Sequence, residues 1–209
     1  KMTIIKDTVQ RFTDLPTVSP NGYVVEVKGD EGTKFDNYYV KFVTNNGGAF
    51  EEGQWEETVE AGIEFKFDYA TMPHVLIRQA DGNFRFAKVD GDTYTASGVS
   101  LTVGDIVSSP NPSFIGRTIN NVFFFRNRLG FLAADNVILS RVSEFFNFFP
   151  ETVLTVLDSE PIDVAASHTK VAILKSAVTM GEKLILFSEQ TQFVLASSAD
   201  NLTPKTANV

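Results

Sequence analysis

Residues 120–150 read NNVFFFRNRLGFLAADNVILSRVSEFFNFFP and contain eight phenylalanines separated by short polar groups. Three apolar runs follow one another, at residues 122–125, 129–133 and 137–140, with turn-forming polar residues between them. Short apolar runs bounded by turn residues are typical of β-strands. The stretch therefore predicts three consecutive strands, and its phenylalanines are expected to form a core.

The composition of the whole chain bounds what can be built around these strands. The chain has 209 residues, 43% of them hydrophobic, which suffices for one large domain or two small ones. It has no cysteine, and His74 and His168 are its only histidines, so no disulfide, metal site or cofactor is expected. No apolar run reaches the roughly 18 residues of a membrane helix, which predicts a soluble protein. A start at Lys1 and an end at Val209, directly after an apolar region, favour a piece of a longer polypeptide.

Acidic charge is concentrated in the first half of the chain. Residues 1–110 hold seventeen acidic and ten basic side chains, whereas residues 111–209 hold nine and eight. Tight binding to nucleic acid of any sequence requires Lys and Arg side chains that neutralise phosphates. The net charge of -8 therefore argues against a protein that grips DNA, although it is compatible with a surface that DNA slides past.

Turn-forming residues divide the chain into three parts. Residues 1–19 are interpreted as a lead-in segment, because Pro16 and the run SPNG at 19–22 form turns. Residues 20–110 are expected to form a small acidic β-rich domain. Residues 111–209 are expected to form a propeller-like β region that is incomplete.

The small domain is predicted from alternating apolar runs. Strands are expected at residues 23–28, 38–43 and 50–58, the last two joined by the loop NNGG, and Trp55 is expected to cover a small core. An Asp-Gly turn within residues 80–83 predicts a second hairpin between the runs PHVLIRQ and FRFAKV.

The remaining elements are less regular. Residues 90–112 are rich in Gly, Asp, Thr, Ser and Pro and are expected to form either a long loop or a pair of weak strands. Ser143 is expected to cap a short helix that carries Phe145, Phe146 and Phe149 on one face and ends at Pro150.

The last fifty residues predict further strands. A strand is expected at residues 162–165, and a hairpin at 183–188 and 192–196, while residues 170–178 fit either a helix or a strand. Strand-turn-strand units of this size resemble propeller blades. The fold class expected is mainly β: a small antiparallel β-rich domain followed by propeller-blade-like β-hairpins, with one or two short helices.

Three arginines are the candidate contact residues. Arg126 and Arg128 flank a turn between two predicted strands, and Arg141 ends the third. They are candidates for contact with an anionic partner or a neighbouring subunit. The alternative is that their long side chains cover phenylalanine surface and bind turn carbonyls.

Catalytic residues were sought and none is expected. Acidic pairs occur at residues 51–52 and 56–57 and within 158–163, and glycosidases use two carboxylates, but acidic residues beside turns are usually solvated. His74, which borders a strand, is interpreted as a packed residue rather than a base. No serine lies in a nucleophile elbow. The sequence therefore predicts no enzyme.

Several motifs in a fixed order resemble one protein family. The motifs are DLP (14–16), PNGYVVEV (20–27), YYVKF (38–42), TMPHVLIRQADGNF (71–84), NPSFIG (111–116), INNVFFFRNRLGFL (119–132), NVILSR (136–141), FFNFFP (145–150), PIDVAAS (161–167), LILFSEQTQFVL (184–195) and LTPKT (202–206). Together they resemble the tail tubular protein B family, the nozzle proteins of short-tailed bacteriophages. Residues 86–109 do not match the family pattern, and the chain is shorter than family members, so it resembles an internal fragment.

The resemblance implies a structural protein of the phage virion tail, made in the cytoplasm of the host bacterium. It implies assembly as a homo-oligomer of six copies, next to a tail ring protein and tail fibres, without stable insertion into a membrane. Such a nozzle retains the packaged genome and conducts the DNA out on infection, without binding it tightly. The family also contains propeller-like β domains.

Two other functions remain open from the residues alone. The first is a tail-associated glycan hydrolase, which would need two carboxylates at catalytic separation in a cleft. The second is a binding module for tail fibres or a host surface, which would present residues such as Trp55 or Tyr94 on an exposed loop.

Overall fold

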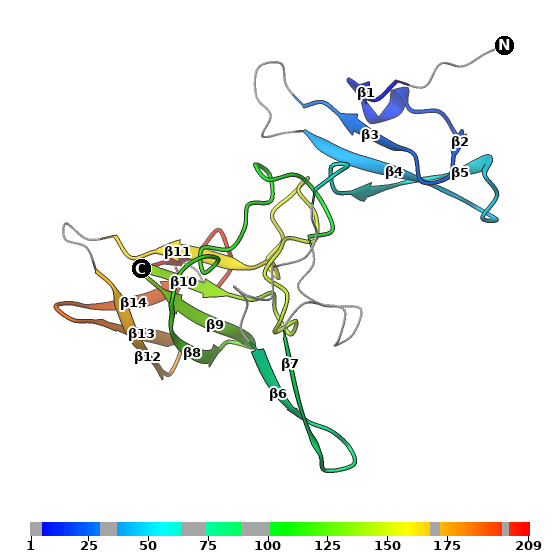
Figure 1. Cartoon of the computed structure of the whole chain (residues 1–209). Coiled ribbons are helices and arrows are strands. Elements are labelled where there is room, and N and C mark those ends of the chain that lie inside the picture. The colour runs from blue at the N-terminus through cyan, green and yellow to red at the C-terminus, as the bar shows by residue number, and fades with distance from the viewer. Residues whose placement is uncertain (1–5, 30–36, 64–73, 89–100, 168–171, 198–200) are drawn as a thin grey trace. The chain divides into compact units, whose positions relative to one another are not determined.

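A computed structural model of the chain describes residues 6–29, 37–63, 74–88, 101–167, 172–197 and 201–209 (Figure 1). Within these ranges the chain forms fifteen strands and one short 3-10 helix, η1 (Phe12–Asp14). No helix among them has the length and apolar character needed to cross a membrane. The mainly β fold class predicted from the sequence is confirmed.

The chain divides into two compact units. Unit 1 comprises residues 1–65, 101–110 and 151–155, and unit 2 comprises the rest. Unit 1 is built on one five-stranded sheet in which β1 runs parallel to β3 and the other neighbours are antiparallel. Its strands, in sheet order, are β1 (Thr8–Val9), β3 (Val24–Val27), β4 (Tyr38–Thr44), β5 (Phe50–Thr58) and β2 (Val18–Pro20). Residues 1–19, expected as a lead-in, thus supply both edge strands.

The core of unit 1 lies on one face of this sheet. Val25 and Val40 are directly paired and both are buried, as alternation along the two strands requires. Trp55 packs on this cluster, contacts Phe42 edge to face at 5.0 Å between ring centroids, and donates its indole N–H to the carbonyl of Pro16 at 2.9 Å. A Cβ at Gly53 would lie 2.2 Å from a backbone oxygen, so only glycine fits beside these rings. The predicted role of Trp55 as cover of the small core is confirmed.

Unit 2 contains two four-stranded sheets of the same kind. In each, every strand pairs antiparallel with the strand that precedes it in sequence. The first sheet consists of β8 (Ile119–Phe125), β9 (Arg128–Ala133), β10 (Asn136–Leu139) and β11 (Ile162–Ala165). The second consists of β12 (Leu174–Met180), β13 (Lys183–Ser188), β14 (Gln192–Ser197) and β15 (Ala207–Asn208). The three strands predicted from the opening stretch are confirmed as β8, β9 and β10.

The two sheets of unit 2 share one hydrophobic core. Alternate residues of β13 and β14 are buried in it, together with Leu132 of β9, a strand whose six residues are all buried. The buried members, drawn from both sheets, are Phe125, Leu132, Val137, Leu139, Ile162, Ala166, Ala172, Leu174, Leu184, Leu186, Phe193, Leu195 and Leu202. Because apolar burial is the main favourable term in folding, the two sheets stabilise each other.

A two-stranded hairpin completes the described strands of unit 2. Strands β6 (His74–Arg78) and β7 (Phe84–Lys88) pair antiparallel, with Leu76 opposite Phe86 and Arg78 opposite Phe84. Gly82 takes the positive φ (87°) that the predicted Asp-Gly turn requires. The hairpin predicted from this sequence is confirmed.

The helix expected after Ser143 is wrong. Ser143 has a positive φ (64°), and its N–H donates to the carbonyl of Asn127 instead of leading into a helix. Residues 141–149 form turns, closed by the N–H of Arg141 donating to the carbonyl of Asn147. The physical reason is that the phenylalanines pack in different directions: Phe145 contacts Phe124, whereas Phe148 stacks on Phe131.

The burial expected for the phenylalanine run also needs correction. On β8, Phe125 is buried but Phe124 is 60% exposed, because neighbours on a strand point to opposite faces. The aromatic core is built instead from Phe114, Phe131 and Phe148, whose ring centroids lie 5.1–5.2 Å apart. Of residues 170–178, which fitted either element, residues 174–178 lie in strand β12, whereas residues 170–171 lie outside the described residues. Of the predicted stretch 90–112, residues 90–100 also lie outside them.

This distribution predicts different costs for two substitutions of the same type. Phe131→Ala should lower the free energy of unfolding by about 3–5 kcal/mol, because Phe131 is buried between two other rings. Phe124→Ala, the matched control, should cost about 1 kcal/mol or less, since it loses one exposed ring contact. Differential scanning calorimetry measures both, and equal losses would contradict the assignment of the core.

Candidate contact site around three arginines

The β8–β9 turn places two of the candidate arginines. Its central residues, Arg126 and Asn127, both have positive φ (47° and 61°), which is the geometry of the tight hairpin turn favoured between twisted strands. Asn tolerates this conformation well, whereas Arg adopts it rarely. The side-chain amide of Asn127 donates to the hydroxyl of Ser143 at 2.7 Å, so the turn is fastened to the loop that carries Arg141.

Arg128 lies inside unit 2, with 1% of its surface exposed. Its guanidinium donates to four backbone carbonyls: Ser140 at 2.6 Å, Glu160 at 2.5 Å, Asp158 at 2.9 Å and Ser159 at 3.3 Å. These acceptors belong to the end of β10 and to the loop that precedes β11. One side chain therefore joins the first sheet to a loop about thirty residues away in sequence.

Arg128 remains a cation in this setting. Burial lowers its pKa to about 10, which is still well above neutral pH. Four carbonyl dipoles directed at the guanidinium replace the water that it has lost, and bonds of this charged kind are stronger than neutral ones. The planar fork of arginine is required, because a lysine ammonium offers fewer donors in a different geometry.

Arg126 and Arg141 are closer to the surface. Arg126 donates to the carbonyl of Glu182 at 3.2 Å, lies 3.7 Å from its carboxylate, and is 5.8 Å from the ring centroid of Phe125. Arg141 pairs with Glu144 at 3.1 Å within its own loop. The structure thus brings the loops of these arginines together through Asn127, but each guanidinium has different partners. Contact of the three with another subunit stays a prediction.

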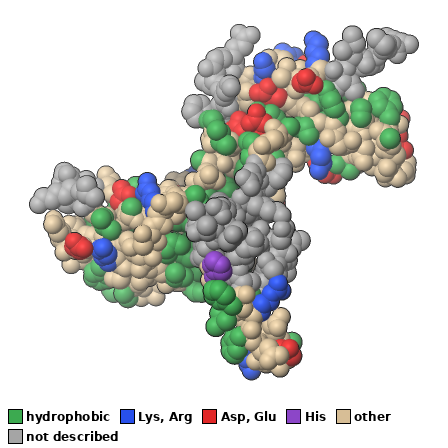
Figure 2. All heavy atoms as spheres, viewed as in Figure 1, with side chains coloured by type: hydrophobic (Ala, Val, Ile, Leu, Met, Phe, Trp, Pro, Cys, Tyr) green, Lys and Arg blue, Asp and Glu red, His purple; other side chains and the backbone are tan. Residues whose placement is uncertain are grey.

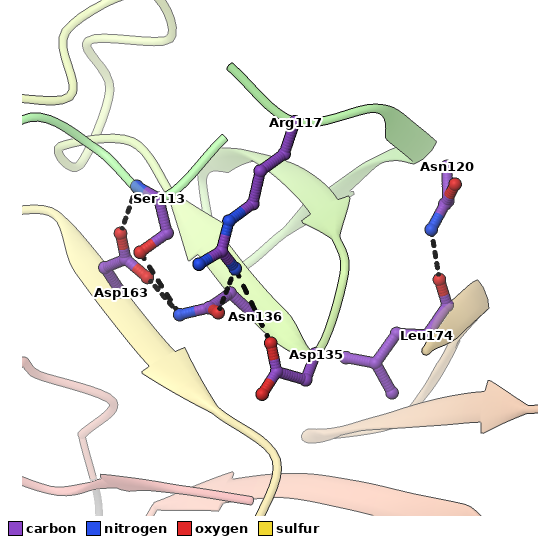
Figure 3. A network of polar contacts seen from close by, with 7 residues as sticks. All are labelled: Ser113, Arg117, Asn120, Asp135, Asn136, Asp163 and Leu174. Carbon is purple, nitrogen blue, oxygen red and sulfur yellow. Dashed lines mark hydrogen bonds and ion pairs between the residues drawn. The ribbon is translucent and has the colours of Figure 1, made fainter. Parts of the chain in front are cut away.

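Sequence reasoning missed a polar network that lies at the other end of the first sheet (Figure 3). Asp163 accepts the backbone N–H of Ser113 at 2.7 Å and the side-chain amide of Asn136 at 2.9 Å. Arg117 in turn donates to the side-chain oxygen of Asn136 at 3.2 Å and lies 3.5 Å from Asp135. The network fixes the segment before β8 onto β10 and β11. The sequence signal was an Asp-Asn pair at a turn, which is too common to be informative by itself.

Three of the carboxylates considered for catalysis, Glu51, Glu57 and Asp163, accept backbone N–H groups. Glu51 accepts the N–H groups of Gly48 at 2.8 Å and Asn46 at 3.0 Å, and Glu57 accepts the N–H of Val153 at 2.9 Å. In the part of the chain that the structure describes, no group of three His, Asp or Glu residues is arranged to hold a metal ion. These acidic groups fasten loops.

His74, the other residue considered for catalysis, packs on an aromatic ring. It stacks on Phe86 with 5.1 Å between ring centroids and 10° between the ring planes. His74 is nevertheless exposed, so the stack lies at the surface and the interpretation of His74 as a packed residue stays a prediction.

In the described residues several charged side chains are bound to the protein's own backbone, and a fold alone does not define the functional class. Comparison with known proteins gives the class a name. Residues 1–209 match the family described as bacteriophage nozzle protein. The chain is also 42% identical over 200 residues to the tail tubular protein gp12 of Escherichia phage T7, covering 96% of this chain and 23% of that protein. The chain therefore belongs to the bacteriophage nozzle protein family, and it spans about a quarter of the length of this relative.

These comparisons confirm two sequence-based predictions. The family recognised from the motifs is the family that matches, and both names place the protein in the tail of the phage virion. The match extends through residues 86–109, where the motifs gave no resemblance.

The bonds of Arg128 predict a large effect of a conservative change. Arg128→Lys should lower the free energy of unfolding by about 3 kcal/mol or more, because at least two buried carbonyls lose their donors at about 1–3 kcal/mol each. Arg126→Lys is the matched control and should cost about 1 kcal/mol or less, as is usual for exposed ion pairs. Urea unfolding monitored by circular dichroism measures both, and equal stabilities would refute the role of Arg128.

The bonds of Glu51 predict a dependence on pH. Hydrogen bonds from the backbone amides of Gly48 and then Asn46 lower its pKa. A lowered pKa in the folded state stabilises the fold above the ordinary pKa of Glu, about 4.3, and this gain is lost as pH falls through the lowered value. Glu51→Gln should therefore lower the urea midpoint at pH 7 and converge with the wild type at acidic pH. Glu52→Gln, which changes the exposed neighbour, is the control; a difference for Glu51→Gln that persists unchanged below the lowered pKa would contradict this account.

Proposed function

We propose that this chain is a structural section of the phage tail nozzle, which retains the packaged genome and conducts the DNA out on infection. In this proposal six copies assemble in the tail, next to a ring protein and the tail fibres. The function is to hold a fixed shape against the load of a packaged genome.

The observation that carries the proposal is the internal fastening of the β scaffold. Arg128 joins β9, β10 and the loop before β11 through four carbonyls, and Asp163 joins the segment before β8 to the same sheet. Buried polar groups that are fully bonded rigidify a fold, and their loss is costly. A scaffold of this kind suits a tube wall better than it suits a catalyst that must open and close.

The distribution of charge supports passage of DNA without tight binding. Unit 1 carries fourteen acidic and six basic side chains, net -8, whereas unit 2 carries twelve of each. The whole net charge of the chain thus belongs to unit 1, and Figure 2 shows acidic side chains grouped on its surface. A negative surface repels phosphates and offers few cations to bind them.

The sheets of unit 2 support the propeller-like architecture that the sequence suggested. Propeller blades are four-stranded antiparallel sheets in which consecutive strands pair, and both sheets of unit 2 have this order. We infer that β8–β11 and β12–β15 are two neighbouring blades.

The alternative functions receive no specific support. One carboxylate of each acidic pair weighed for a glycan hydrolase, Glu51 and Glu57, accepts loop amides, and the absence of enzymatic activity stays a prediction. Of the residues weighed for a binding module, Trp55 is packed on the core of unit 1, and Tyr94 lies outside the described residues. Of the three arginines, Arg126 and Arg141 remain the candidates for subunit or partner contacts. Arg128 is buried and binds backbone carbonyls instead.

Complementation of the phage tests the proposal. Particles assembled without the protein should lose their DNA, so the genome becomes sensitive to nuclease, and infectivity should fall with it. Supplying the wild-type protein in the host should restore both, whereas Arg128→Lys should restore them less well at elevated temperature because the scaffold is weaker. Infectious particles with protected DNA in the absence of the protein would refute the proposal.

The interaction with DNA is tested separately. The purified chain should bind duplex DNA more weakly than about 10⁻⁴ M at physiological salt, the weak end of ordinary nonspecific binding. Fluorescence anisotropy with a labelled duplex measures this affinity. Micromolar binding with a steep dependence on salt would contradict a channel that releases DNA freely.

A further inference from the structure

The β6–β7 hairpin presents an apolar face to solvent. Leu76, Phe84 and Phe86 are 66%, 62% and 70% exposed. Leu76 and Phe86 are paired directly, and Phe84 lies two positions from Phe86, so all three side chains share one face. Figure 2 shows hydrophobic side chains together with basic ones along this hairpin.

Such a face is unusual on a hairpin of this size. A two-stranded hairpin is marginally stable in water by itself, and a third strand or a covering surface is normally needed. Single exposed apolar residues are common, but three large ones on adjacent positions mark a contact surface. Within the described residues no third strand pairs with this hairpin, so its apolar face is available for a contact.

Charge selects the kind of partner. Arg78 pairs with Phe84 and so belongs to the apolar face, where it is exposed. Among the described residues no carboxylate pairs with Arg78, since the one acid of the hairpin, Asp81, accepts the N–H and the amide of Asn83 in the turn. An apolar face with a cation at its edge is complementary to a surface that carries acidic side chains beside an exposed apolar one.

The outer face of β5 has these properties. Glu52, Gln54 and Glu56 alternate on its exposed side, and Phe50, at the start of the same row, is 63% exposed. The row carries two acids, and Lys41 of β4, which pairs with Glu56 in register, lies beside it on the same face. It lies in the unit that holds the whole net negative charge of the chain.

We propose that the apolar face of the β6–β7 hairpin docks on the acidic β5 row of a second copy of this chain, with Arg78 directed at Glu52 and Glu56. The contact joins two different surfaces, so it is of the head-to-tail type, which forms a ring when the rotation between copies closes. This inference rests on one part of the proposed function, namely that the chain works as an assembly of identical copies.

Charge reversal in the full-length protein tests the contact. Arg78→Glu should weaken self-association, measured by sedimentation velocity, by about tenfold or more, because a close charge pair becomes a repulsion. Glu52→Lys with Glu56→Lys should weaken it similarly. Arg85→Glu is the matched control: it makes the same change of charge on the opposite face of the hairpin, next to Ile77 in register, and should have little effect.

Mixing the variants makes the test specific. The Arg78→Glu protein and the Glu52→Lys, Glu56→Lys protein should each associate poorly alone but assemble together, because every contact between them again joins opposite charges. Failure of the mixture to assemble, or equal effects of Arg78→Glu and Arg85→Glu, would overturn the inference while the proposed function stands. Infectious, DNA-retaining particles without the protein would instead remove the proposed function, so the two failures are distinguishable.

Discussion

The buried guanidinium of Arg128 is the interaction on which the described part of unit 2 depends most. It is a cation with 1% exposure, and it is tolerated because backbone carbonyls surround it. Those carbonyls belong to the end of one strand and to an irregular loop that has no sheet neighbours of its own. The hydrogen bonds from Arg128 thus fix the position of this irregular loop, as the hydrogen bonds between neighbouring strands fix the position of a strand.

The same solution recurs across the described chain with acceptors in place of donors. Glu51 fixes a hairpin loop, Glu57 fixes residues 152–153, and Asp163 fixes the segment before β8, each by accepting backbone N–H groups. These charged side chains, which at first suggest catalysis, therefore fix the conformation of loops instead. This is a physical reason why a chain rich in acids and poor in regular helix can still form well-defined connections.

Sequence patterns predicted most strands because the local signals were strong. The Asp-Gly turn and the alternation around it predicted β6 and β7, and the runs after Asn120 predicted β8 to β10. The patterns failed where a contact distant in sequence decides the outcome. Phe124 is exposed because the strand alternates, and the helix after Ser143 does not form because Asn127 holds that residue in a turn. Whether an arginine faces inward, as Arg128 does, also depends on carbonyls up to thirty-two residues away.

The shared core of unit 2 has a consequence for how this part of the chain can be divided. Leu132 and Leu139 from the first sheet and Leu184 and Leu195 from the second belong to one cluster, so each sheet covers an apolar face of the other. A truncation between β11 and β12 would leave two open apolar sheets prone to pairing with other chains. The side-chain amide of Asn120 donates to the carbonyl of Leu174, which is fifty-four residues away in sequence. The core therefore forms only after strands that are distant in sequence have come together. The smallest autonomous module here is thus the sheet pair, and an evolutionary exchange of parts would have to move both sheets together.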